Sequence, residues 1–213
     1  GTRLKPLTDN VPKPLVPVAG RPFLEWQLRY FQEQGFKKFL FLVSYRAQQI
    51  VDYFGDGQKW NVKIEYSTEP EPLGTGGALK LAEAKLEARF FLVNGDSFLP
   101  INLREMAAKT YGAHFANRKP GGTVVISVFC NQPPTSVPNN LKLEPSGEIF
   151  RVLDYRKGGG VGNGFAWVDS GVYLLDKEVI AEGRETVFQL ESLWPKLISD
   201  DSLFGFECKN RFF

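Results

Sequence analysis

Apolar strand-like runs alternate with helical patterns through the first half of the chain, and this alternation constrains the fold more than any other feature. The runs at residues 38–44 (KFLFLVS), 62–66 and 89–93 are separated by helical patterns at residues 47–54 and 76–86. Strands that are apolar on both faces and are joined through helices are typical of parallel sheets with both faces covered. We therefore expect an α/β fold with a mostly parallel sheet.

The second half of the chain has a pattern typical of antiparallel strands. Two short apolar runs flank a turn at residues 145–147 (PSG) and predict a hairpin. Further strands are expected at residues 165–175 and 203–208, with a helix at residues 186–198. The predicted fold is a Rossmann-like, mostly parallel mixed sheet with helices on both faces and an antiparallel addition in the second half. No linker divides the sequence, so residues 1–213 are expected to form a single domain.

Composition and charge exclude several classes of partner. The formal net charge is only +2 over 213 residues, with basic and acidic side chains interleaved, so we expect no nucleic-acid or membrane surface. No apolar run approaches the roughly 20 residues that a membrane span requires. Cys130 and Cys208 lie far apart without metal-ligand spacing and are expected to be reduced thiols of a cytoplasmic protein. A homo-oligomer is compatible with the sequence.

Residues 1–18 form the first candidate site. They contain four prolines and little periodicity, so an irregular loop is expected, and long loops often have functional roles. Arg3 and Lys13 lie ten residues apart in this loop, among glycine and small hydroxyl residues. Backbone N–H groups of such a loop can wrap a triphosphate while two cations neutralise it. A solvated basic loop is the alternative interpretation of an isolated Arg–Lys pair.

The motif GTRLxPLT followed by PKPLxPV, which includes both cations, resembles the opening signature of the sugar-phosphate nucleotidyltransferase family. Members of this family join a nucleoside triphosphate to a sugar 1-phosphate and release pyrophosphate. The resemblance implies that Arg3 contacts the reacting phosphates and that Lys13 bridges the phosphates of the two substrates. Gly1 and Thr2 would line the nucleotide pocket. The resemblance extends to about Cys208, and the family's first strand and C-terminal end are expected to be missing.

The segment at residues 69–78 (EPEPLGTGGA) is the second candidate site. Read alone, it is a strand, a turn and a helix start in which glycines only ease packing. In the family, a side chain at the Glu69 position and backbone groups at Gly74 read the nucleobase edge, and Thr75 belongs to the same nucleotide-binding segment. Guanine offers two adjacent donors that a carboxylate can accept, whereas a carbonyl oxygen of uracil or thymine would repel it. Glu69, or Glu71 if the alignment shifts by two residues, therefore favours GTP.

Asp96, in the segment at residues 93–97 (VNGDS), follows a buried strand and is the third candidate. An isolated Asp in such a place is more often a helix cap or a turn residue. It matches the family's metal-binding Asp, and magnesium takes one or two carboxylates together with phosphate oxygens. The resemblance therefore implies Mg²⁺ at Asp96 and places Gly95 beside the sugar phosphate. The family's second metal-binding Asp is expected to follow Phe213.

The residues expected to bind the sugar phosphate depart from the family pattern at two positions. Lys157 matches the lysine that holds the sugar phosphate, but Arg156 replaces a Glu that usually touches sugar hydroxyls. Asp169 likewise replaces an Asn that contacts the sugar. A surface charge cluster beside a strand is the alternative interpretation of these residues.

The residues and the resemblance together predict an enzyme that transfers GMP from GTP to D-glycero-D-manno-heptose 1-phosphate or mannose 1-phosphate. The phosphate nucleophile is largely ionised at neutral pH, because its second pKa is about 6, so no general base is needed. Catalysis would come from positioning and charge neutralisation by Arg3, Lys13 and Lys157, together with magnesium on Asp96. One alternative is a uridylyl- or thymidylyltransferase acting on glucose 1-phosphate. Another is a catalytically silent regulatory subunit that binds a nucleotide-sugar.

Overall fold

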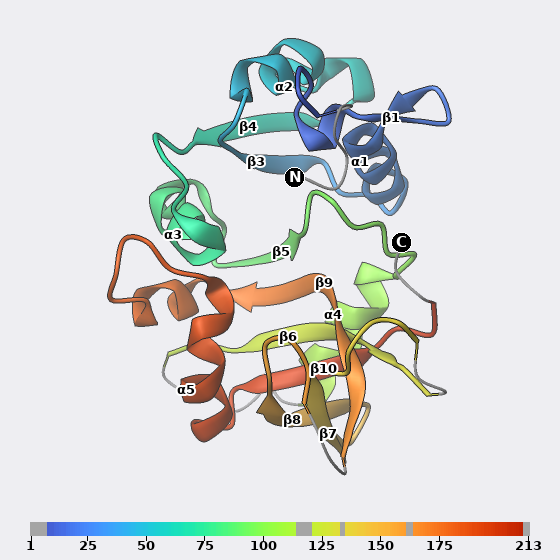
Figure 1. Cartoon of the computed structure of the whole chain (residues 1–213), viewed down its shortest axis with the longest axis vertical. Coiled ribbons are helices and arrows are strands. Elements are labelled where there is room, and N and C mark those ends of the chain that lie inside the picture. The colour runs from blue at the N-terminus through green and yellow to red at the C-terminus, as the bar shows by residue number, and fades with distance from the viewer. Residues whose placement is uncertain (1–7, 114–120, 133–134, 161–163, 211–213) are drawn as a thin grey trace.

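The computed structural model describes residues 8–113, 121–132, 135–160 and 164–210, and its strands form three sheets (Figure 1). The first sheet is a short antiparallel pair, and the second is a parallel pair that keeps one register along its whole length. The third contains six strands. The two small sheets are formed by β1 (Pro17–Val18) with β2 (Arg21–Pro22), and by β3 (Lys38–Val43) with β4 (Lys63–Thr68).

The six-stranded sheet curls on itself. Its strand order is β5-β9-β6-β10-β8-β7, and β7 also pairs with β9, so five of its strands close into a ring. The twelve residues of β9 allow this closure because they pair with β5, β6 and β7. A register shift between Ile126 and Val128 adds the bending that irregular pairing produces. The strands are β5 (Arg89–Val93), β6 (Val124–Cys130), β7 (Leu141–Ser146), β8 (Ile149–Tyr155), β9 (Phe165–Asp176) and β10 (Leu203–Glu207).

The mixed α/β class is confirmed, but the expectation of one mostly parallel sheet is wrong for the described residues. The parallel pairs are β3 with β4 and β10 with β6, and the other pairings are antiparallel. The physical reason is that β5 pairs with the long β9 from the second half of the chain, so β5 belongs to the curled sheet. The predicted hairpin is confirmed in β7 and β8, and its turn includes Gly147 at a φ of 67°.

Helices pack on both faces of the six-stranded sheet, and the alternation of side chains along β6 shows this directly. Val124 and Ile126 belong to a buried cluster that contains Trp194, whereas Val125 belongs to a second cluster that contains Met106. The described α-helices are α1 (Phe23–Glu33), α2 (Ala47–Phe54), α3 (Gly74–Leu81), α4 (Leu103–Ala113) and α5 (Trp194–Ser199). In the described ranges, none of them has the length and apolar character to cross a bilayer.

The helix predicted at residues 186–198 is wrong in its first half. Residues 185–187 form a bend and Gln189 is extended. The chain then forms a 3₁₀ turn at Leu190–Leu193 and becomes α-helical only in α5, which has a proline in its first turn. The backbone of Phe188 explains the non-helical start. Its N–H donates to Leu73, and its carbonyl accepts from Gly76 and Gly77 at the start of α3. These hydrogen bonds tie the backbone of Phe188 to the start of α3 and take the place of bonds within a helix.

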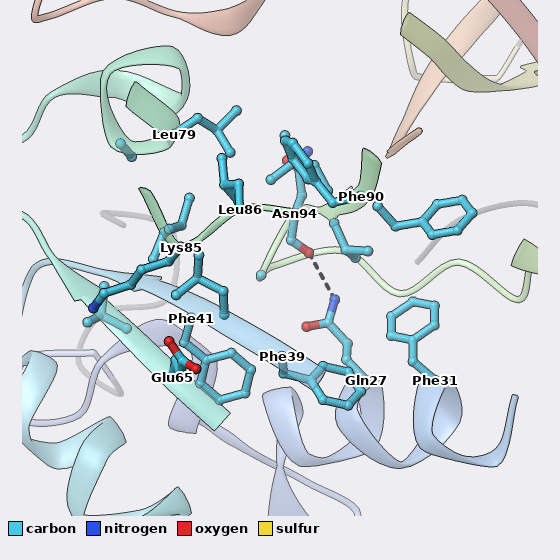
Figure 2. A pocket seen from close by; sticks show the side chains of 18 of the residues that line it. Gln27, Phe31, Phe39, Phe41, Glu65, Leu79, Lys85, Leu86, Phe90 and Asn94 are labelled. Atoms are coloured by element: carbon cyan, nitrogen blue, oxygen red, sulfur yellow. Dashed lines mark hydrogen bonds between the residues drawn. The ribbon is translucent and has the colours of Figure 1, made fainter. Parts of the chain in front are cut away.

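A cavity of about 1100 Å³ lies between β3 and β5, and we call it the central cavity. Figure 2 shows Phe39, Phe41 and Phe90 around it, with a hydrogen bond of 2.9 Å from Gln27 Nε2 to the carbonyl of Asn94. Among the described strands, β3 pairs only with β4, and β5 pairs only with β9. The unpaired edges of β3 and β5 therefore line opposite sides of a mainly apolar cavity, and its border also includes polar residues of the predicted site.

Candidate functional site

Lys13 and Asp96, which are 83 residues apart, form an ion pair with 2.6 Å between Nζ and Oδ2. Lys13 begins the 3₁₀ turn η2 (Lys13–Leu15), which follows Pro12, and Asp96 follows the end of β5. The two side chains are 40% and 49% exposed. An ion pair this exposed contributes about 0–1 kcal/mol, so incoming charged ligands can displace it at low cost.

The segment around Asp96 is joined to the segment around Asp169. The N–H of Asn94 donates to the carbonyl of Gly171 at 3.0 Å, and the N–H of Gly171 donates to Asp169 Oδ1 at 2.8 Å. Gly171 has a φ of 78°, and a Cβ there would lie 2.7 Å from Asn94 Nδ2. Glycine is therefore required for this close approach. The two predicted motifs at Asp96 and Asp169 are neighbours across β5 and β9.

Asp169 has an unusual ionisation. Burial raises its pKa to about 6, and the nearby negative charge of Glu191 adds to this effect. Hydrogen bonds from the Gly171 N–H and from the Tyr173 hydroxyl, 3.0 Å from Oδ2, act in the opposite direction. The folded protein therefore favours the protonated carboxyl more strongly than an unfolded chain does.

Asp169→Asn is expected to change the free energy of unfolding more favourably at pH 8 than at pH 4. An unfolded Asp titrates near 4, so the raised pKa makes the wild type lose stability between about pH 4 and pH 6, and the loss stays constant above that range. The asparagine carries no such charge. Urea unfolding of both proteins at pH 4 and pH 8 should show a relative gain of about 1–3 kcal/mol at pH 8. Equal differences at the two pH values would contradict the raised pKa.

The segment that contains Glu69 borders the central cavity. Glu69 Oε2 accepts the N–H of Leu73 at 2.9 Å, just before α3. Glu69, Gly74 and Thr75 line the cavity, whereas Glu71 is exposed and does not line it. Of the two glutamates that the sequence leaves open, the structure therefore places only Glu69 at the cavity.

The glycines at the start of α3 are required for packing. Gly74 has a φ of 74°, and a Cβ there would lie 2.5 Å from the Phe188 carbonyl. At Gly76 and Gly77, a Cβ would lie 2.2 Å from the Phe188 ring and 2.3 Å from the Thr186 carbonyl. The packing interpretation of this glycine-rich segment is therefore correct. It is compatible with a ligand-binding role for Gly74, which borders the cavity.

A second hollow, which we call the side cleft, has a volume of about 830 Å³ and contains Lys157. Lys157 Nζ lies 2.7 Å from Glu191 Oε1. Arg156, which also lines the cleft, pairs with Asp154 at 3.0 Å. Gln189 lines both the side cleft and the central cavity, so the two hollows are adjacent at this residue.

The structure brings most of the described candidate residues to one region. Lys13 and Asp96 form one contact, and the central cavity is bordered by Pro14 and Gly95, which are their chain neighbours. Lys157 lies in the adjacent side cleft, and Asp169 lies behind Asn94. Gly1, Thr2 and Arg3 lie outside the described residues.

Sequence reasoning missed Glu191 and Gln189. Both fall in the segment that the sequence predicts as the start of a helix, and no motif distinguishes them from other polar residues. Their positions depend on the non-helical backbone at Phe188, which is held by hydrogen bonds to a segment more than a hundred residues earlier.

Comparison with known proteins supports the resemblance. The profile of the family described as nucleotidyl transferase matches residues 1–136. D-glycero-alpha-D-manno-heptose 1-phosphate guanylyltransferase of Campylobacter jejuni is 42% identical over 106 residues, or 50% of this chain and 48% of that protein. Mannose-1-phosphate guanyltransferase 2 of Candida glabrata is 33% identical over 215 residues, or 98% of this chain and 56% of that protein. The chain thus spans about half the length of these relatives.

Solved structures show the same fold. The crystal structure of HddC from Yersinia pseudotuberculosis complexed with GMP-PN is 26% identical, with a TM-score of 0.74, and the match covers 100% of this chain and 88% of that one. A UTP-bound UGPase from Acinetobacter baumannii has a TM-score of 0.76 at 17% identity, covering 100% of this chain and 84% of that one, which supports the fold alone. The family profile covers more than half of the residues. The chain therefore belongs to the nucleotidyl transferase family.

Proposed function

We propose that the protein transfers GMP from GTP to a heptose or mannose 1-phosphate and releases pyrophosphate. The observation on which this proposal rests is the contact of Lys13 with Asp96 beside the cavity that Glu69 borders. Relatives named as heptose 1-phosphate and mannose-1-phosphate guanylyltransferases support the choice of substrates. A similar structure complexed with GMP-PN supports the choice of guanine.

Lys13 and Asp96 are proposed to exchange each other for substrate and metal as partners. Lys13 Nζ and Asp96 Oδ2 lie 2.6 Å apart in an exposed ion pair. When GTP binds, the ammonium turns to the phosphate oxygens and the carboxylate becomes available to a cation. Arg3, ten residues before Lys13 in the sequence, is proposed as the second cation on the phosphates. The ion pair of Lys13 with Asp96 therefore keeps these two groups near their proposed places without binding them tightly.

Magnesium is the proposed metal, and Asp96 is its proposed protein ligand. Within the described ranges, no group of three or more Asp, Glu, His or Cys side chains gathers as a metal cluster. A single exposed carboxylate fits magnesium, which binds proteins through one or two carboxylates together with substrate phosphates. Bound there, the ion would neutralise charge on the reacting phosphates.

The main requirement of the proposed reaction is to bring two polyanions together, and proton transfer is less important. An oxygen of the sugar phosphate, ionised at neutral pH, bonds to the α-phosphorus of GTP, and the bond to the departing pyrophosphate breaks. Lys157 holds the sugar phosphate in the side cleft, and Lys13 lies where the phosphates of the two substrates meet. The adjacency of the two hollows at Gln189 supports this arrangement.

Glu69→Gln is expected to lower kcat/KM for GTP by about 10- to 100-fold, because a hydrogen bond to a charged group contributes about 1.5–3 kcal/mol. Since Oε2 already accepts the Leu73 N–H, the carboxylate meets guanine mainly through Oε1. ITP lacks the exocyclic amine, so the wild type should prefer GTP to ITP and the variant should lose this preference. Glu71→Gln, on an exposed neighbour outside the cavity, is the matched control and should leave both values unchanged. A loss of GTP preference in Glu71→Gln but not in Glu69→Gln would contradict the assignment of Glu69 as the residue that binds guanine.

A Rossmann-like core is proposed for the first half of the chain, within a single domain of residues 1–213. The order β3, α2, β4, α3 and β5 supports it, because strands there alternate with helices.

The function is tested by supplying the full-length protein with each nucleoside triphosphate, Mg²⁺ and mannose or heptose 1-phosphate while pyrophosphate is measured. The expected result is release with GTP. Release with UTP or dTTP instead would support a uridylyl- or thymidylyltransferase. Binding of GDP-mannose without any release would support a catalytically silent regulatory subunit.

A further inference from the structure

Among the described residues, one ion pair joins the two walls of the side cleft. One wall consists of residues 155–159 after β8, and the other of residues 182–195. Two other charged residues of the cleft have partners: Arg156 pairs with Asp154 at 3.0 Å, and Glu182 pairs with Lys196 at 3.5 Å. Lys157 and Glu191, 2.7 Å apart, are the pair that spans the walls.

The two partners of this pair differ in how firmly they are held. The Lys157 side chain is 70% exposed, whereas the Glu191 side chain is 26% exposed. Glu191 lies in the 3₁₀ turn between the buried residues Leu190 and Leu193, so its backbone is anchored in the core. A lysine ammonium moves on a flexible four-carbon stem. A phosphate that enters the cleft can therefore draw the ammonium away, while the carboxylate stays in place.

A carboxylate left in this position needs new donors. An ionised carboxylate only accepts hydrogen bonds, and sugar hydroxyl groups are donors. Tyr155, Gln189 and Ser192 line the same cleft as Glu191 and carry polar side chains. Burial is the main cause that raises the pKa of Tyr155 to about 12, and the charges of Asp169 and Glu191 add to it. The surroundings of Glu191 are thus polar and suited to a hydroxylated ligand.

We propose that Glu191 is a specificity-determining residue that accepts hydrogen bonds from sugar hydroxyls once the phosphate has taken Lys157. This inference rests on the proposed function, because it concerns the sugar phosphate of the same reaction. Arg156 stands where the family has a Glu that touches sugar hydroxyls, and it is paired with Asp154. Glu191 would supply a carboxylate in the same cleft. The simpler interpretation is that the ion pair only holds the two walls together, and we call this role a latch. A latch would affect stability and leave the sugar preference unchanged.

The experiment measures binding of mannose 1-phosphate and of inorganic phosphate to the full-length protein by calorimetry, in the presence of GDP and Mg²⁺. The wild type is expected to bind mannose 1-phosphate at least about 10-fold more tightly than phosphate. Glu191→Gln should bind phosphate as well as the wild type and lose most of the preference for the sugar. Glu185→Gln lines the same cleft at an exposed position and is the matched control, with no expected change.

Loss of affinity for both ligands in Glu191→Gln, or a lower thermal midpoint with the sugar preference intact, would overturn the proposal in favour of the latch. Deoxy analogues of mannose 1-phosphate add a second measurement. The wild type should discriminate against at least one of them, and Glu191→Gln should no longer do so. The binding result does not depend on turnover, so a wild type that binds the sugar phosphate with this preference but releases no pyrophosphate would contradict the proposed function and still support Glu191.

Discussion

Lys13→Ala is expected to lower kcat/KM for GTP and sugar 1-phosphate by about 10²–10³-fold, a loss typical of removing one group that stabilises charge in a transition state. The ammonium is placed where the phosphates of the two substrates meet, so the loss should appear mainly in kcat. Stability should hardly change, since the pair with Asp96 is exposed and contributes about 0–1 kcal/mol. Pyrophosphate release and thermal unfolding check the two parts.

Lys109→Ala is the matched control for this prediction. Lys109 forms a similarly exposed ion pair with Glu105 on α4, with 2.8 Å between Nζ and Oε1, and lines neither hollow. Its removal should change stability as little as that of Lys13 and should leave turnover intact. Equal activities of the two variants would show that the Lys13–Asp96 contact is an ordinary surface ion pair.

Asp96→Asn is expected to reduce turnover by at least about 10²–10³-fold and to raise the magnesium concentration needed for half-maximal activity. An amide oxygen is a weaker ligand than a carboxylate for a hard cation, because it lacks the negative charge. The second readout does not depend on activity: calorimetric titration of Mg²⁺ in the presence of a non-hydrolysable GTP analogue should show weaker binding in the variant.

Asp200→Asn provides the comparison for Asp96→Asn. Asp200 pairs with Lys196 in an exposed contact of the same kind and lies outside both hollows. It should leave the magnesium titration unchanged. Unchanged magnesium binding in Asp96→Asn would contradict its assignment as the metal ligand.

Lys13 and Asp96 are recognisable as candidates from the sequence because each lies in a long motif beside a local element. Proline residues stiffen the loop of Lys13, and the buried strand before Asp96 is recognisable from its apolar run. Their ion pair is not predictable, because it depends on how two segments 83 residues apart are brought together. The hairpin of β7 and β8 is predictable for a similar reason, since its turn is encoded by three adjacent residues.

The curled sheet and the non-helical segment at Phe188 are not predictable from local patterns. An apolar run such as β5 reads the same whether its neighbour is parallel or antiparallel, and here the length of β9 decides its partner. Residues 186–189 are part of a helical pattern, but the Phe188 N–H donates to Leu73 and its carbonyl accepts from Gly76 and Gly77, which overrides that pattern. Glu191 and Gln189 become recognisable as site residues only after that tertiary pairing is known.

A crystal structure of the full-length protein with a non-hydrolysable GTP analogue, Mg²⁺ and mannose 1-phosphate would test the central claim directly. The triphosphate is expected within hydrogen-bond distance, about 3 Å, of the Lys13 ammonium, with guanine at Glu69 and the metal on Asp96. A triphosphate bound elsewhere, with Lys13 still paired to Asp96, would contradict it.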